Sequence, residues 1–194
     1  MVFLQSCPAW NPKGCGPTQR VEVDKVTDAN KLNQMTVWQQ LLSLGGALLL
    51  CYTAAAIGGL ASVTAEDFYA LLDRPTWAPP AWLFGPVWSV LYTLIGISSW
   101  LVWKNSRFTV RLPYVILIAQ LLANALWSWL FFVWQLGLAA VLEIALLWLL
   151  IVMNIVAFHR QSATAAILLL PYLCWVSFAA MLTIALWLAN PSLL

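Results

Sequence analysis

LPYVILIAQLLANALWSWLFFVW, residues 112–134, is a run without a charged side chain. Its polar groups are a few amides, hydroxyls and indoles. A helix that crosses the hydrocarbon core of a bilayer needs roughly 20 mostly apolar residues. This run satisfies that length, so we predict that it crosses a membrane as one helix.

The same pattern extends over most of the chain, in which only 8% of residues are charged, whereas soluble domains average about 25%. The charge-free runs are 32–65, 75–103, 112–142 and 161–194. They accommodate spans at roughly 37–62, 84–104, 112–134, 138–158 and 164–188. Short links between most of these spans indicate antiparallel neighbours. We therefore predict an all-α, polytopic membrane protein, a bundle of five transmembrane helices within residues 37–190.

Residues 1–36 differ from the rest because they are polar and interrupted by Pro8, Pro12 and Pro17. No apolar core of signal-peptide length lies near Met1, and the composition is not the Arg-rich, acid-poor one of a transit peptide. We expect a mostly disordered or surface-lying N-terminal extension. The composition fits a cell membrane or an organelle membrane equally well.

The basic residues are distributed unequally between the two sides of the predicted bundle. Those on the side of the N-terminus are Lys25, Lys31, Lys104, Arg107, Arg111 and Arg160. Arg74 falls on the opposite side. Because loops rich in Lys and Arg stay in the cytoplasm, we predict a cytoplasmic N-terminus.

The composition also argues against several classes of site. A net charge of +2 with scattered basic residues does not provide a track for nucleic acid. The cysteine and histidine spacing does not suggest a metal site. Cys51 and Cys174 lie in apolar runs and are most simply packing residues. Cys7 and Cys15 can form a disulfide or remain free thiols.

The connection between the first two predicted spans, residues 63–83, is rich in proline and tryptophan. Charged residues place it in water. Pro75, Pro79 and Pro80 stiffen it, because proline fixes φ and restricts the residue before it. Loops of this length are often functional lids, and we expect one here.

A stripe of polar and aromatic residues follows one face of the third predicted span. Gln120, Asn124, Trp127, Ser128 and Phe131 lie at i, i+4, i+7, i+8 and i+11. Hydrogen-bonding groups mixed with aromatic planes suit a pocket for a large amphipathic ligand. The alternative is a polar stripe that holds helices together.

Two further faces carry aromatic residues. They consist of Trp88, Leu91, Tyr92 and Ile95 on the second span, and of Pro171, Trp175, Phe178 and Leu182 on the fifth. Both helices can bring indoles toward a shared interior. Aromatic core packing is the alternative interpretation.

Glu143 is the only charged side chain between Arg111 and His159. It can pair across the bundle, extend to the interface or stay protonated, and a structural role is favoured over a proton relay. His159 is expected to be solvated at the cytoplasmic end of the fourth span. A haem beneath the opposite loop would lack an axial histidine, with Cys174 a weak substitute, so metal-free porphyrin or face-bound haem is favoured.

Residues 37–188 resemble the translocator protein (tryptophan-rich sensory protein) family. The resemblance is carried by Arg74-Pro-Thr-Trp77-Ala-Pro79-Pro80, Trp82, Phe84-Gly-Pro86-Val-Trp88 and Leu91-Tyr92; by Gln120-Leu121, Asn124, Trp127-Ser128 and Phe131-Phe132; by Glu143-Ile144 and Leu147-Trp148; and by Pro171-Tyr172-Leu173, Trp175 and Phe178-Ala179. It implies a five-helix bundle whose pocket is roofed by the first loop. Members of this family bind porphyrins and haem, and some bind cholesterol.

The resemblance, together with the stripes, gives the expected ligand-binding residues. They are Arg74, Trp77, Trp82, Trp88, Tyr92, Gln120, Asn124, Trp127, Phe131, Trp175 and Phe178. Porphyrin or haem is expected as ligand, with no required cofactor and no metal site. Enzymatic activity would amount at most to light-dependent porphyrin breakdown, for which the resemblance implicates Trp88 and Trp175.

Other functions compatible with the resemblance are a sterol- or lipid-binding transport protein and a ligand-regulated signalling partner in the membrane. The family's sterol motif needs a basic residue soon after a tyrosine in the fifth span, and none follows Tyr172. A small-xxx-small pair, Ala119 and Ala123, can let two protomers pack closely, so we predict a homodimer through this face.

Overall fold

The computed structural model describes residues 36–63, 65–106 and 111–194. Its helices are α2 (Val37–Ala61), α3 (Ala65–Leu71), η2 (Ala81–Leu83), α4 (Phe84–Ser106), α5 (Leu112–Ser128), η3 (Trp129–Val133), α6 (Gly137–His159), α7 (Ala163–Leu168) and α8 (Leu170–Ala189). The expectation for residues 1–35 lies outside the described residues. Leu42–Leu194 forms one compact unit, and the packing described below is that of this unit.

Five helical segments of the described chain are long and apolar enough to cross a membrane. They are Val37–Ala61, Ala81–Ser106, Leu112–Val133, Gly137–His159 and Ala163–Ala189. This confirms the predicted all-α bundle of five transmembrane helices, with boundaries within a few residues of those expected. The protein is a multi-pass integral membrane protein.

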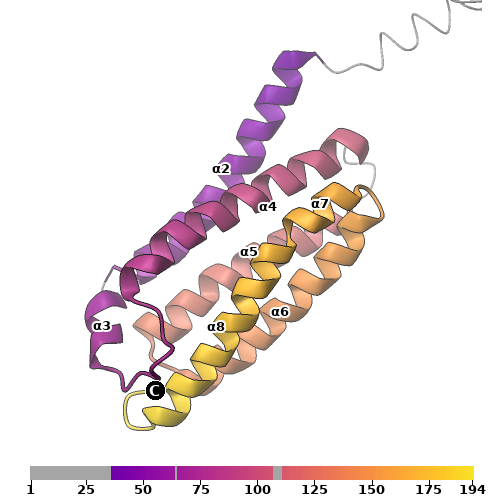
Figure 1. Cartoon of the computed structure of the whole chain (residues 1–194). Helices are drawn as coiled ribbons and strands as arrows, with labels where there is room; N and C mark the ends of the chain where they lie inside the picture. The colour runs from indigo at the N-terminus through magenta and orange to yellow at the C-terminus, as the bar shows by residue number, and fades with distance from the viewer. Residues whose placement is uncertain (1–35, 64, 107–110) are drawn as a thin grey trace, which may run out of the picture. The chain divides into compact units, whose positions relative to one another are not determined.

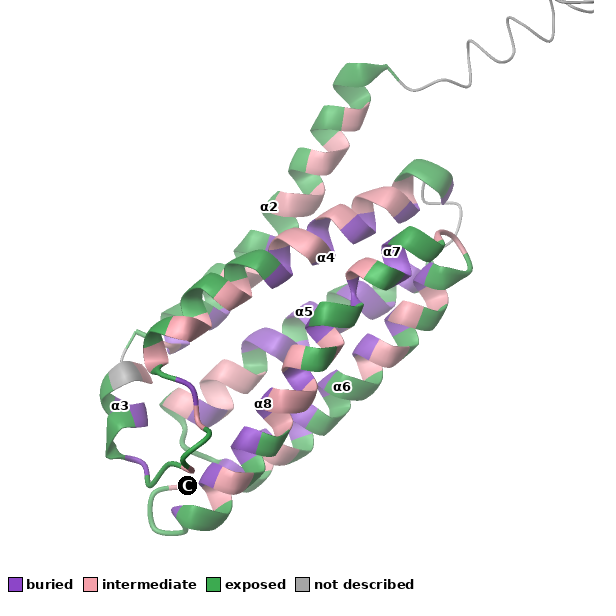
Figure 2. Cartoon of the chain, viewed as in Figure 1, coloured by how far each residue is buried: buried purple, intermediate pink, exposed green. Residues whose placement is uncertain are grey.

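The core of the bundle forms where α6 packs against α5 and α8, while α4 packs against α7 (Figure 1). Tyr172, Ile95, Leu117 and Ile151 are almost completely buried there. Figure 2 shows the exposed residues on the outer sides of these helices. Large apolar side chains such as Leu142 remain exposed on that surface. In a bilayer this surface contacts lipid instead of water, so its exposure carries no aggregation cost.

The connection predicted as a lid contains a short helix, α3, that the sequence did not indicate. Phe68, Tyr69 and Leu72 are buried on one side of this segment. The Tyr69 hydroxyl donates a hydrogen bond to the carbonyl of Pro79 at 3.0 Å. Burial raises the pKa of Tyr69 although the nearby Arg74 acts in the opposite direction. A helix this short is marginal in isolation, so its stability comes from this packing.

Two of the membrane helices are irregular. At the end of α5 the chain forms one π-helical turn, η3, and Gln135 then adopts a φ of 53°. Gly137 lies two residues further on, and a Cβ there would overlap the Trp187 ring. The span predicted at 164–188 is broken between α7 and α8 at Leu169. Pro171 explains this break, because it lacks an N–H and cannot continue the helical hydrogen-bond ladder.

Candidate functional site

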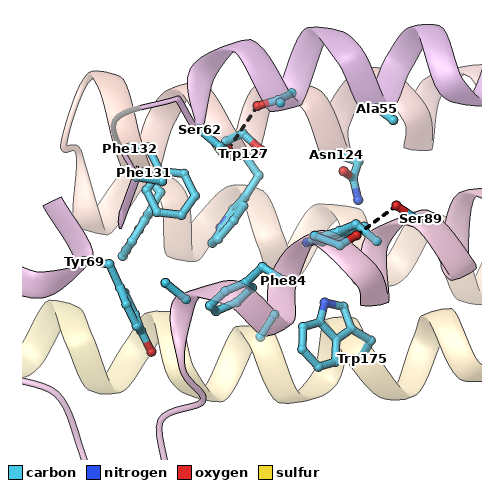
Figure 3. Close-up of a pocket in the computed structure, with 18 of the residues that line it drawn as sticks. Ala55, Ser62, Tyr69, Phe84, Ser89, Asn124, Trp127, Phe131, Phe132 and Trp175 are labelled. Carbon is cyan, nitrogen blue, oxygen red and sulfur yellow. Dashed lines mark hydrogen bonds between the residues drawn. The ribbon is translucent and has the colours of Figure 1, made fainter. Parts of the chain in front are cut away.

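A cavity of about 600 Å³ lies within the bundle, walled by α2, α4, α5 and α8 and bordered by α3 and η2 (Figure 3). Pockets for drug-sized ligands are usually between about 300 and 1,000 Å³. Seven of the residues predicted to bind ligand line this cavity: Trp82, Trp88, Tyr92, Asn124, Trp127, Phe131 and Trp175. The structure therefore brings the stripes of the second, third and fifth spans to one space.

The aromatic rings around the cavity hold one another in fixed orientations. Trp127 stacks on Phe131 with ring centroids 5.3 Å apart and an interplanar angle of 8°. Across the cavity, the edge of Phe84 meets Trp175 at 6.0 Å and 73°. Stacked and edge-to-face pairs are favourable geometries for aromatic rings. The walls are thus preformed flat surfaces suited to another aromatic system.

Asn124 joins three helices at the buried side of the cavity. The Tyr92 hydroxyl of α4 donates to Asn124 Oδ1 at 2.8 Å, and Asn124 Nδ2 donates to the Tyr172 hydroxyl of α8 at 2.9 Å. The Asn124 side chain is 5% exposed. Its amide is therefore committed to the protein while it also lines the cavity. The two interpretations of the third-span stripe, a pocket wall and a link between helices, both hold at this residue.

Four of the residues predicted to bind ligand lie outside the cavity lining: Arg74, Trp77, Gln120 and Phe178. The Arg74 guanidinium sits over the Tyr69 ring, 4.8 Å from its centroid, and borders a separate shallow hollow among prolines. Trp77 is half exposed and packs edge-on against Phe178 at 5.8 Å. Gln120 is fully buried, away from the cavity.

The comparison with protein families identifies the chain. A family model described as TspO/MBR family matches residues 47–188. The chain belongs to the TspO/MBR family. Tryptophan-rich protein TspO of Chlorobaculum tepidum is 39% identical over 79% of this chain and 99% of its own length. Translocator protein of Bos taurus is 37% identical over 77% of this chain and 86% of its own length.

A further relative, Protein CrtK of Rhodobacter capsulatus, is 33% identical over 73% of this chain and 88% of its own length. The match includes both the bundle and the segment that closes it. The resemblance noted in the sequence is therefore confirmed for the TspO/MBR family as a whole.

In this TspO/MBR member the helix α2 supplies a cavity wall that sequence reasoning missed. Ala55, Ala56, Gly58, Gly59 and Ser62 line the cavity. Small residues let helices approach closely, and Gly58 does pack closely against α5. A Cβ on Gly58 would lie 3.6 Å from the Ala125 Cα atom. The small side chains of this wall also leave room for a ligand.

Two indole N–H groups at the cavity wall have no hydrogen-bond acceptor among the residues that the structure describes. They belong to Trp127 and Trp175. Buried polar groups are normally paired in native proteins. Because both N–H groups are buried, a ligand with acceptor oxygens would give each indole a partner only if its binding turned the ring within the packing described above.

Three polar side chains deeper in the bundle are also without a partner in the described part of the chain: Gln120, Glu143 and Asn154. Glu143 is only 7% exposed. The structure therefore shows neither a pairing partner for its carboxyl nor an extension to the interface. Two of the three alternatives drawn from the sequence, pairing across the bundle and extension to the interface, are therefore not seen in the described chain.

The described residues contain no group of three or more His, Cys, Asp or Glu side chains that could hold a metal ion. His159 is exposed at the end of α6, and neither it nor Cys174 lines the cavity. Cys51 is buried and Cys174 is exposed on the outer surface, while Cys7 and Cys15 lie outside the described residues. A haem in this cavity would find neither a histidine nor a cysteine among the described lining residues, so contacts with its ring faces would contribute most of its binding.

The predicted dimer face is only partly at the surface. Ala123 is 8% exposed and belongs to the hydrophobic core, whereas Ala119 is half buried. A large side chain at 123 would disturb the protomer itself. The homodimer and the cytoplasmic N-terminus stay predictions.

Proposed function

We propose that this TspO/MBR protein binds a tetrapyrrole, protoporphyrin or haem, in the cavity and acts in porphyrin trafficking, sensing or light-dependent degradation. The observation that supports this most is the convergence of Trp88, Trp127 and Trp175, from three different helices, on one cavity of about 600 Å³. A porphyrin is a flat aromatic plate, and the cavity offers several aromatic faces for it.

The energetics of stacking support affinity in the micromolar range. Each aromatic contact contributes roughly 0.5–1.5 kcal/mol beyond the burial of its area. Three indole contacts would add about 2–4 kcal/mol to that burial. Micromolar affinity requires about 8 kcal/mol in total, which the apolar surface of a porphyrin can supply together with these contacts.

The polar requirements of a porphyrin also match the site. Its carboxylate oxygens can accept hydrogen bonds from the unpaired indole N–H groups of Trp127 and Trp175. Arg74 does not line the cavity, because its guanidinium stacks on the Tyr69 ring outside the lining. An interaction of Arg74 with a propionate would be confined to the rim.

The first step of light-dependent degradation needs an electron donor next to the bound ring, and later cleavage of the ring needs an oxidant such as dissolved dioxygen. On illumination, an electron can pass from the indole of Trp88 or Trp175 to the excited porphyrin. The products of this step are an indole cation radical and a porphyrin anion radical. Because no acid/base pair is required, this step fits a cavity lined mainly by aromatic and small side chains.

The test compares bleaching of bound protoporphyrin under light with its stability in the dark. The variant is Trp88→Phe/Trp175→Phe, and the matched control is Trp148→Phe, an exposed indole of α6 that hydrogen-bonds to Ser177 instead of lining the cavity. Faster bleaching in the unmodified protein and the control than in the double variant supports degradation. Equal bleaching in all three, with binding retained, supports a carrier or sensor.

Sterol or lipid binding is the second candidate. It is favoured by the small, mostly apolar residues that α2 contributes to the wall, among them Ala55, Ala56 and Gly59. A sterol has no aromatic face, so it would gain less from the indoles. Competition between cholesterol and protoporphyrin for the cavity distinguishes the two candidates.

A further inference from the structure

The helix α2 is the most weakly buried wall of the cavity. In its most apolar window 17% of residues are buried inside the protein, compared with 28–39% for the other four spans. Its buried residues are Cys51, Gly58 and Ala61. A wall with so few buried residues can be displaced at lower cost than α5, α6 or α8.

The two edges of α2 are attached in different ways. On the edge toward α5 and η3, Gly58 packs closely, with its would-be Cβ 3.4 Å from Ser128 Oγ. There the Trp129 indole donates to the carbonyl of Ile57 at 3.2 Å. Close backbone packing together with a hydrogen bond makes this edge suited to act as a hinge.

On the edge toward α4, the attachment next to the cavity is a single side chain. The Tyr52 hydroxyl lies 2.8 Å from Thr93 Oγ1 and donates to the carbonyl of Ser89 at 3.3 Å, and Thr93 Oγ1 donates to the same carbonyl at 2.8 Å. Tyr52 is 43% exposed. Beyond it, away from the lid, Leu48 contacts α4 at Gly96.

On the lid side of Tyr52 the seam between α2 and α4 is open. Gly59 and Gly85 both line the cavity. A Cβ added to either glycine would meet nothing within 4 Å. Ser89, labelled in Figure 3, lines the same side and is exposed. The cavity wall along this seam is therefore interrupted next to Tyr52.

The lid is attached more firmly than this seam. Asn190 bonds the backbone of Asp73 twice and so ties the lid to the end of α8, while the bond from Tyr69 to Pro79 lies within the lid itself. These bonds are buried or half buried. A ligand that passed under the lid would have to break the two half-buried bonds from Asn190, whereas one that passed beside Tyr52 would release one exposed side chain from Thr93 and Ser89.

We propose that the cavity is loaded sideways from the hydrocarbon phase, through the seam between α2 and α4, with Tyr52 as its latch. The ligands are therefore amphiphiles that first dissolve in the bilayer and that carry a hydrogen-bonding group. In hydrocarbon an unpaired hydroxyl is costly, so the latch stays closed until a polar group of the ligand can replace Thr93 as the partner of Tyr52. This inference rests on the proposed function only in requiring that the cavity binds a ligand.

The kinetic test uses the protein in lipid nanodiscs with protoporphyrin added to the lipid phase, and follows binding in the dark by stopped flow. Tyr52→Phe removes the latch and keeps the ring, and it should raise both association and dissociation rates by about two- to tenfold, the factor expected for one hydrogen bond. Gly59→Leu fills the open seam and should slow both rates. In Tyr52→Phe the ratio of the two rates changes less than the rates themselves.

Two control variants locate the route. Trp129→Phe removes the hydrogen bond on the hinge edge, and Asn190→Ala loosens the lid. Rates that respond to Tyr52→Phe and Gly59→Leu, but not to Asn190→Ala, support the lateral route. Rates that respond to Asn190→Ala or Trp129→Phe but not to Tyr52→Phe overturn it.

A measurement without porphyrin separates this inference from the proposed function. In nanodiscs made with brominated acyl chains, the difference in fluorescence between the unmodified protein and Trp88→Phe reports how closely lipid chains approach Trp88. With Tyr52→Phe as background, quenching of Trp88 should increase. If quenching of Trp88 is unchanged, the lateral route is overturned even if porphyrin binds. If quenching increases but porphyrin does not bind saturably, only the tetrapyrrole assignment is rejected.

Discussion

The side chain of Asn190 forms a two-point clasp on the backbone of Asp73. It accepts a hydrogen bond from the Asp73 N–H at 2.8 Å and donates one to the Asp73 carbonyl at 3.1 Å. These residues are 117 positions apart. The clasp thus fixes the segment that follows α3 to the end of α8, and with it the lid over the cavity.

Asn190→Ala should destabilise the protein by about 1–3 kcal/mol, because it leaves a half-buried N–H and carbonyl unpaired. Asn105→Ala is the matched control, since Asn105 also donates from its amide to a backbone carbonyl, that of Gln161, but at an exposed site. Thermal unfolding in detergent and proteolysis within residues 65–83 measure both effects. Equal behaviour of the two variants would show that the clasp does not hold the lid.

Asn124→Leu should be more damaging than substitution of a cavity-lining residue without hydrogen bonds, because it leaves the buried hydroxyls of Tyr92 and Tyr172 without their partner. We expect a loss of roughly 2–4 kcal/mol in unfolding free energy. Replacing both tyrosines by phenylalanine in the Asn124→Leu background should restore part of it, since removing both partners of a hydrogen bond is nearly neutral. Strictly additive losses would argue against the three-residue link.

Glu143→Gln should be tolerated. Both carboxyl oxygens are buried without a partner in the described chain, so the substitution removes an acid without breaking an ion pair. The unfolding temperature should be unchanged or higher. A loss above about 2 kcal/mol would reveal a partner that holds the charged form.

Gly137→Ala should destabilise the protein by about 1–3 kcal/mol, the usual range for overpacking. The added methyl would collide with Trp187 and the side chain of Leu194. Gly45→Ala is the control, because its Cβ would meet nothing within 4 Å, and alanine favours a helix over glycine. The unfolding temperature should therefore fall in Gly137→Ala and rise in Gly45→Ala. A lower unfolding temperature in both variants would contradict the packing described at Gly137.

The parts of the fold that could be predicted follow from local physics. Long charge-free runs must be membrane helices, because no other single segment satisfies its backbone in hydrocarbon. The irregularities were harder to predict. The helix α3 depends on the burial of its own Phe68 and Tyr69, and after η3 the chain passes so close to the distant Trp187 that position 137 has no room for a Cβ.

The candidate site was predictable where it lies on regular helices. Helical spacing placed Trp88, Trp127 and Trp175 on inward faces, and all three line the cavity. The lid residues were not predictable in this way, since the course of the lid is fixed by Asn190 far along the chain. As a result, Arg74 and Trp77 lie outside the cavity lining, although they belong to the lid segment that borders the cavity.

The most direct measurement of the central claim is a titration of protoporphyrin into the purified protein in the dark, followed by quenching of tryptophan fluorescence. The claim predicts saturable quenching with micromolar affinity in the unmodified protein and in Trp148→Phe. In Trp88→Phe/Trp175→Phe the affinity should fall by about fivefold or more, the factor for about 1 kcal/mol of lost stacking. Equal affinity in all three proteins, or quenching that never saturates, would contradict it.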